Sequence, residues 1–223
     1  SHEDYTVYGS GSSFTFTPQD DGPHAISLVV TDPTGAHGGA AEWVLQTTVD
    51  AVNVAPELGG IGGLPSNPQE GDVIGLWPLV SDGGSADELA YNWIIRKNGS
   101  TDPYVSGQES TIEFVPDDQG EYGVSLAVTD DGGATATATA TLVVGNAAPS
   151  VTILDAPGLV IEGDEVELSS QVEDPGSLDT CTLSWSVLKD GQPYTLGPET
   201  DTTSNRFAFI AADDGEYAAT MTA

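Results

Sequence analysis

The sequence predicts an all-β protein built from sandwiches of two packed sheets. Short segments alternate apolar residues with small or polar ones, which is the period-two burial of strands in a sheet. Clusters of Asp, Gly, Asn and Pro separate these segments, and no stretch has helical periodicity over a useful length. The clearest alternation places four side chains on one face of a single segment: Tyr122, Val124, Leu126 and Val128.

The stretch from 53 to 145 holds enough strands for a complete sandwich. The expected strands cover 57–60, 73–80, 89–96, 104–106, 110–115, 121–129 and 134–144. Trp93 is the expected core aromatic of the third strand, facing Ile74 and Leu76 of the second. The pair Asn98-Gly99 predicts a tight turn. Tyr122 predicts a tyrosine corner, in which the ring packs inward and the hydroxyl bonds to upstream backbone.

Marks of this stretch recur along the chain. Four of them return 92 residues on: Glu70-Gly71-Asp72 as Glu162-Gly163-Asp164, Asp82 as Asp174, Asp87 as Asp179, and Trp93 as Trp185. The corner tyrosine returns as Tyr217, whereas an earlier copy has His24, so we expect its corner hydrogen bond to differ or be absent.

The recurrences divide the chain into three repeats. Residues 1–52 are the C-terminal half of one repeat, 53–145 a complete repeat, and 146–223 a repeat that lacks its last strand. Because a sandwich without its last strand has an unpaired edge, we expect the chain to be an excerpt of a longer array. The alternative is that neighbouring molecules complete each other by strand donation.

The chain is strongly acidic. It has 35 Asp and Glu against 4 Lys and Arg, a formal net charge of −31. This charge would repel nucleic acid and anionic membrane surfaces, so we expect no nucleic-acid partner and no direct membrane insertion. Cations are the natural partners. The alternative is that the charge only keeps the surface hydrated, or suits a salty habitat.

Catalytic motifs are missing from the sequence, so we expect the protein not to be an enzyme. It contains no nucleophile elbow, phosphate loop or zinc-protease motif. His2, His24 and His37 lack the spacing of metal ligands and are expected at the surface or in a corner. Cys181 alternates with the apolar residues that follow it, which predicts a buried, inert thiol.

Several motifs together resemble those of a known family. They are the Asn-x-Ala-Pro starts at 53–56 and 146–149, the Trp of the third strand, the tyrosine corner, and Val-Thr-Asp at 128–130 before a glycine turn. In these features the chain is similar to tandem polycystic kidney disease (PKD) domains. The resemblance implies immunoglobulin-like β-sandwiches of extracellular or cell-surface proteins, acting as spacers, adhesive surfaces or substrate-engaging accessories of secreted hydrolases.

One end of each such sandwich gathers acidic and amide side chains. The start of the repeat meets the loops after its second and sixth strands, and calcium takes about six to eight oxygen ligands of these types. The resemblance implies that Asn53, Asp82 and Asp130 match metal-binding positions of the family. The full candidate set is Asn53, Asp82, Asp87, Asp130 and Asp131 in the complete repeat, with Asn146, Asp174 and Asp179 in the third. The alternative is that all are ordinary turn residues.

A second candidate calcium site lies where one repeat meets the next. Five acidic residues come from loops at the opposite end of the complete repeat: Glu70, Asp72, Asp117, Asp118 and Glu121. We expect them to face Asn146 and Asp174, where a bridging calcium would stiffen the array. Solvated turn carboxylates explain the same residues.

Two functions from different classes fit these features. In the first, the chain is an extracellular structural or adhesive spacer, stiffened by calcium, in a large surface or filament-forming protein. Its partners would be neighbouring repeats of the same or an identical chain. In the second, it is a non-catalytic accessory region of a secreted hydrolase that binds a protein or polysaccharide ligand, with Trp43 and Trp77 as candidate exposed platforms.

Overall fold

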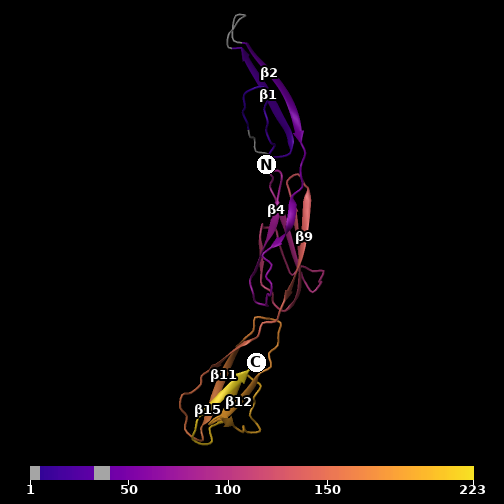
Figure 1. The fold of residues 1–223 in the computed structure, drawn as a ribbon. Coiled ribbons are helices and arrows are strands. Elements are labelled where there is room, and N and C mark those ends of the chain that lie inside the picture. The colour runs from indigo at the N-terminus through magenta and orange to yellow at the C-terminus, as the bar shows by residue number, and fades with distance from the viewer. Residues whose placement is uncertain (1–5, 33–40) are drawn as a thin grey trace. The chain divides into compact units, whose positions relative to one another are not determined.

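The computed structural model describes residues 6–32 and 41–223 and shows strands connected by turns and loops (Figure 1). His2 and His37 lie outside these residues. The described residues contain no helix, and therefore none that could cross a membrane. The chain divides into two compact units. The first comprises Ser1–Pro65, Ile74–Phe114 and Glu121–Leu142, and the second comprises Ser66–Val73, Val115–Gly120 and Val143–Ala223.

Seven strands between residues 57 and 144 form two sheets that pack as one sandwich. One sheet has the order β3-β4-β7, with β3 at Glu57–Gly62, β4 at Ile74–Ser81 and β7 at Ile112–Phe114. The other has the order β6-β5-β8-β9, with β5 at Ala90–Lys97, β6 at Val105–Gly107, β8 at Gly120–Thr129 and β9 at Thr135–Val144. All seven strands are confirmed, and their ends lie within two residues of the predicted ones.

The core of this sandwich joins the two sheets through aromatic rings. Trp93 is 0% exposed, and its indole Nε1–H donates to the backbone oxygen of Glu109 over 3.1 Å. The rings of Phe114 and Tyr122, from opposite sheets, have centroids 5.9 Å apart. Because burial alternates along each strand, the predicted inward face of β8 is confirmed.

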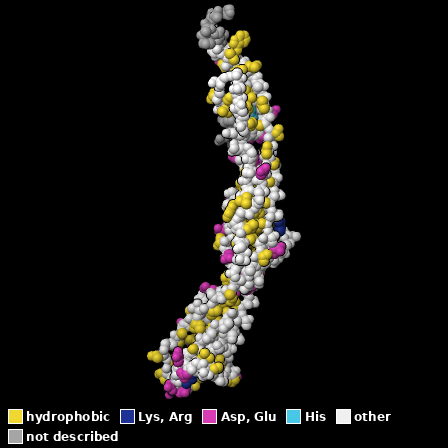
Figure 2. Space-filling model, in the orientation of Figure 1, with side chains coloured by type: hydrophobic (Ala, Val, Ile, Leu, Met, Phe, Trp, Pro, Cys, Tyr) yellow, Lys and Arg dark blue, Asp and Glu magenta, His cyan; other side chains and the backbone are white. Residues whose placement is uncertain are grey.

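The strands β1 (Gly22–Asp32) and β2 (Ala41–Ala51) form an antiparallel hairpin in the first unit. Leu28 pairs with Leu45 and Val30 with Trp43, and each of these side chains is more than half exposed. Figure 2 shows hydrophobic side chains open on this hairpin. His24 Nδ1 donates to the backbone oxygen of Gly22 over 3.0 Å, so this corner has a hydrogen bond different from that of a tyrosine corner, as predicted.

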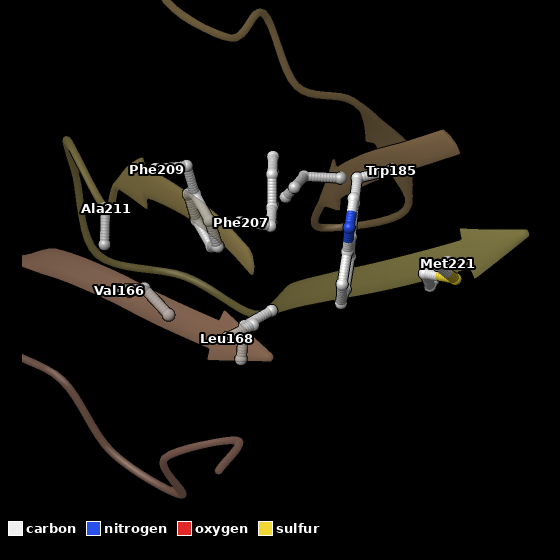
Figure 3. Packing of buried hydrophobic residues seen from close by; sticks show 8 residues of the cluster. Val166, Leu168, Trp185, Phe207, Phe209, Ala211 and Met221 are labelled. Atoms are coloured by element: carbon white, nitrogen blue, oxygen red, sulfur yellow. The ribbon is translucent and has the colours of Figure 1, made fainter. Parts of the chain in front are cut away.

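The second unit contains two further three-stranded sheets. One has the order β10-β11-β14, with β10 at Ser150–Leu154, β11 at Glu165–Glu173 and β14 at Arg206–Ile210. The other has the order β13-β12-β15, with β12 at Ser184–Lys189, β13 at Gln192–Pro193 and β15 at Tyr217–Thr222. Trp185 of β12 stacks on Phe207 of β14, with ring centroids 5.0 Å apart, so these sheets also pack face to face (Figure 3).

Positions 92 residues apart share their local geometry. Asn98 and Gly99 have φ angles of 50° and 70°, which the predicted tight turn requires, and Asp190 and Gly191 repeat it with 48° and 78°. At Tyr217 the tyrosine corner is confirmed, because its hydroxyl donates to the backbone oxygen of Asp213 over 2.9 Å.

Replacing the core indole should be costly, whereas replacing the exposed one should not. We expect Trp93→Ala to lower the free energy of unfolding by about 3–5 kcal/mol, because it removes a fully buried ring and leaves a cavity. Trp43→Ala, in the same unit and 73% exposed, is the control and should change it by less than about 0.5 kcal/mol. Urea unfolding followed by circular dichroism measures both. Equal losses would contradict the assignment of Trp93 to the core.

Candidate metal centre

The loop between β4 and β5 closes on itself and presents two carboxylates. Asp82 Oδ1 accepts the backbone N–H of Gly84 over 3.0 Å, and the Asp87 N–H donates to the Gly84 oxygen over 3.2 Å. A Cβ on Gly84 would lie 2.3 Å from Asp87 Oδ1, so a larger residue would displace that carboxylate. The local turn therefore positions Asp82 and Asp87 together.

A third carboxylate, that of Asp130, directly follows the end of β8. Asp130 is only 4% exposed; its Oδ1 accepts the N–H of Ala134 over 2.7 Å and its Oδ2 accepts the Asn53 amide N–H over 3.1 Å. A Cβ on Gly132 would lie 2.3 Å from Asn53 Nδ2, so the glycine turn makes room for the amide. These bonds hold Asp130 against the segment that precedes β3.

The three aspartates meet. One oxygen from each of Asp82, Asp87 and Asp130 lies within 4.8 Å of the others, and Asp87 forms a similar group with Asp20 and Asp131. The Oδ2 atoms of Asp82 and Asp87 are buried and accept no hydrogen bond. Five predicted ligands, Asn53, Asp82, Asp87, Asp130 and Asp131, thus lie around one small region.

Electrostatic repulsion in this group is substantial. Two unit charges 4 Å apart repel by about 4 kcal/mol at an effective dielectric constant of 20. Burial, and then the neighbouring carboxylates led by Asp82, raise the pKa of Asp87 to about 6. A proton or a cation relieves the repulsion, and carboxylate and amide oxygens are the ligands that calcium prefers.

The corresponding loop of the second unit has the same turn but different neighbours. Asp174 Oδ1 accepts the Gly176 N–H over 3.0 Å, and the Asp179 N–H donates to the Gly176 oxygen over 3.1 Å. Asp179 lies with Glu70 and Asp118, within 4.8 Å of both. Asn146 Nδ2 donates to the backbone oxygen of Ala147. Among the described residues Asp174 belongs to no group of three carboxylates.

Of the five acidic residues predicted at the repeat junction, two belong to a group of three carboxylates in the described residues and three do not. Glu70 and Asp118 come together, but with Asp179 rather than with Asn146 and Asp174. Asp72 Oδ2 instead accepts the N–H of Gln69 over 2.8 Å. Across residues 6–32 and 41–223, neither Asp117 nor Glu121 joins a group of three carboxylates.

Two acidic groups contain residues that were not predicted from the sequence. Asp20 follows Pro18 by two residues, as Asp118 follows Pro116, so aligning the corners would have found it. Glu162, Asp213 and Asp214 form an exposed group in the second unit, and Lys189 Nζ lies 3.5 Å from Asp213 Oδ2.

The prediction of a buried Cys181 is wrong. The residue is exposed, because β12 begins only at Ser184 and Cys181 lies in the preceding loop. Its Sγ–H donates to Asp174 Oδ2 over 3.2 Å. This hydrogen bond raises the pKa of the Cys181 thiol, which keeps it protonated and weakly nucleophilic.

Comparisons with known proteins found solved structures of low sequence identity. No protein-family model and no curated protein matches the chain. Among solved structures, murine CEACAM1b is 17% identical over 75% of this chain and 92% of its own, with a TM-score of 0.28. A carbohydrate-binding module from the β-sandwich superfamily is 16% identical over 76% and 85%, with a TM-score of 0.34. The chicken CNTN1 FN1–FN3 domains are 10% identical over 87% and 70%, with a TM-score of 0.30.

Asp87 should make stability depend on pH when divalent ions are absent. Its folded pKa of about 6 exceeds its ordinary value of 3.8, so the folded state holds the extra proton between these values. Stability therefore falls as the pH rises from about 4 to about 6 and stays lower above. At pH 7 without divalent ions, we expect Asp87→Asn to be more stable than the unmodified chain by roughly 1–3 kcal/mol, and to lack the fall.

Melting curves from pH 3.5 to 7.5 in chelator measure this difference. Asp102→Asn is the matched control, because Asp102 is exposed in the same unit and its variant should follow the unmodified chain. If the melting temperature of Asp87→Asn depends on pH in the same way as that of the unmodified chain, the raised pKa of Asp87 does not govern this pH dependence.

Proposed function

We propose that this chain is a non-catalytic, extracellular β-sandwich repeat region that serves as a spacer or adhesive stalk. We further propose that it binds calcium at the end of the β3–β9 sandwich where Asp82, Asp87 and Asp130 meet. The observation that carries the proposal is the group of Asp82, Asp87 and Asp130, in which two buried oxygens accept no hydrogen bond. Buried carboxylate oxygens without a donor are costly unless a cation reaches them.

The ligand types select the ion. The group offers carboxylate oxygens, with the Asn53 amide bonded to Asp130 beside them, and holds no His or Cys ligand. Zinc and copper favour nitrogen and sulfur ligands, whereas calcium takes oxygen ligands in a flexible geometry. Magnesium demands a near-ideal octahedron and keeps several waters. Calcium is therefore the cation we assign.

Binding would fix three segments that lie far apart in the sequence. Asn53 precedes β3, Asp82 and Asp87 lie between β4 and β5, and Asp130 follows β8. A cation shared by the three aspartates joins the loops of both sheets at one end of the sandwich. The resemblance to PKD domains supports an extracellular spacer, and a net charge of −31 disfavours nucleic acid and anionic membranes as partners.

Calcium should stabilise the first unit through this group. At a calcium concentration 100 times the dissociation constant, we expect about 2.7 kcal/mol of added stability, because the ion binds the folded state alone. Asp82→Asn should lose most of this gain while its side-chain oxygen can still accept the Gly84 N–H. The measurement is the melting temperature with calcium or chelator. Asp102→Asn should respond like the unmodified chain.

The same titration separates binding from charge screening. Magnesium at equal concentration, and sodium chloride at equal ionic strength, should raise the melting temperature less than calcium does. Equal effects of all three salts, or no effect of calcium, would remove the proposed site.

An accessory, ligand-binding role is the second candidate, and Trp77 favours it. The ring is 48% exposed and lies against the backbone of Gly62 and Gly63, where an added Cβ would lie 2.3 Å and 2.7 Å from ring atoms. A half-exposed indole packed against glycine backbone is the kind of platform on which a sugar ring stacks.

Retention on insoluble polysaccharides and on collagen tests this second role. If Trp77 is a platform, the chain is retained on at least one of these materials and Trp77→Ala lowers the retention by about tenfold. Trp43→Ala reports separately on the other exposed indole. Absence of retention on every material would leave the spacer role alone.

A further inference from the structure

Backbone bonds in the second unit bring together three segments that are remote in sequence. The Glu70 N–H donates to the Gly145 oxygen over 3.1 Å, and the Gly71 N–H donates to the Pro116 oxygen over 2.9 Å. Glu70 Oε1 accepts the N–H of Ala147 over 2.7 Å. Glu70 is therefore fixed from both the 115–120 segment and the segment after β9.

The other oxygen of Glu70 has no partner in the protein. Glu70 is 2% exposed, and its buried Oε2 accepts no hydrogen bond. A Cβ on Gly176 would lie 2.9 Å from this oxygen and 2.8 Å from Asp179 Oδ2. Because Gly176 lacks that carbon, both oxygens can approach the same point. One oxygen from each of Glu70, Asp118 and Asp179 lies within 4.8 Å of the others.

We propose that Glu70, Asp118 and Asp179 form a second calcium site, contained in the second unit. It shares no residue with the group of Asp82, Asp87 and Asp130, so either site can exist without the other. A buried carboxylate oxygen that lacks a donor and faces two further carboxylates is stabilised by a bound cation.

Part of the arrangement occurs a second time, in the first unit. Asp20 and Asp87, at the positions of Asp118 and Asp179 in the repeat, also lie within 4.8 Å of each other. The corner backbone accepts a hydrogen bond from the loop in both cases: Ala86 N–H to the Gln19 oxygen over 3.0 Å, and Ser177 Oγ–H to the Asp117 oxygen over 3.4 Å. In both units, therefore, an aspartate two residues after a proline lies close to the last aspartate of the acidic loop, although the surrounding sequences differ.

The repeat counterpart of Glu70 provides a contrast. Glu162 lies with Asp213 and Asp214, but all three are exposed, and Lys189 forms an ion pair with Asp213. Figure 2 shows acidic side chains together with a basic one at this surface. Water and lysine therefore stabilise the exposed group, whereas the buried oxygen of Glu70 has access to neither.

The spacing fits calcium. Two ligands on opposite sides of an ion are separated by about twice the metal–oxygen distance, which for calcium is about 2.3–2.6 Å. Oxygens that all lie within 4.8 Å of one another can therefore share one calcium ion. Three carboxylates, each able to bind through one or two oxygens, supply much of the coordination shell. Such an ion would hold 66–73 and 115–120 against the loop at 174–179.

Hydrogen–deuterium exchange on the whole chain, with and without calcium, tests the site. We expect calcium to slow exchange of the Glu70 and Gly71 amides and of 115–120 by at least about tenfold, since opening these segments would release the ion. Glu70→Gln should abolish this protection while keeping an oxygen for the Ala147 N–H. Protection of the Asp82–Asp87 loop should remain in this variant, and Asp82→Asn should show the reverse pattern.

Glu162→Gln is the matched control, because it changes the exposed counterpart and should leave calcium protection at 66–73 unchanged. If Glu70→Gln fails to fold, Asp179→Asn removes a ligand from the opposite segment and should give the same loss. Unchanged exchange at 66–73 in the unmodified chain, protection that survives both substitutions, or equal protection by magnesium or sodium chloride would overturn the proposal.

Discussion

An aspartate that accepts the N–H of the glycine two residues ahead determines where the acidic groups lie. This bond closes the loop at Asp82 and again at Asp174. In both loops the last aspartate, Asp87 or Asp179, donates its N–H to the same glycine. The turn thus presents one carboxylate in a fixed direction, whichever segments lie opposite. The opposing segments then decide whether that carboxylate meets Asp130 or Glu70.

The sandwich cores supply the rigidity that this arrangement needs. Repelling carboxylates separate unless their backbones are held, and the loops are held by strands whose inner faces pack around Trp93 and Trp185. In the β1–β2 hairpin, by contrast, the apolar side chains of Leu28 and Trp43 are exposed, so they bury little apolar surface. Burial of the core side chains therefore offsets the electrostatic cost of gathering acids at the loops.

Acidity alone does not distinguish a binding site in a chain with 35 acidic residues. Other carboxylates here accept backbone N–H groups, as Asp201 does from Thr203, or, like Asp213, lie beside a lysine. The informative atoms are the buried oxygens of Glu70, Asp82 and Asp87 that accept no hydrogen bond. Both proposed calcium sites rest on these atoms, and the raised pKa of Asp87 reports the same lack of compensation in the first of them.

The sequence by itself determined the strands, because alternating burial and turn chemistry act between residues close in the chain; β5 and β8 needed no tertiary information. The recurrence of Asp82 and Asp87 as Asp174 and Asp179 also identified both loops as candidate metal-binding loops. Only the tertiary structure decided which acids meet: Asp179 joins Glu70 and Asp118, and Asp20 approaches Asp87. It also decided that Cys181 is exposed. These contacts depend on the paths of segments separated by many residues, and no local pattern encodes such a path.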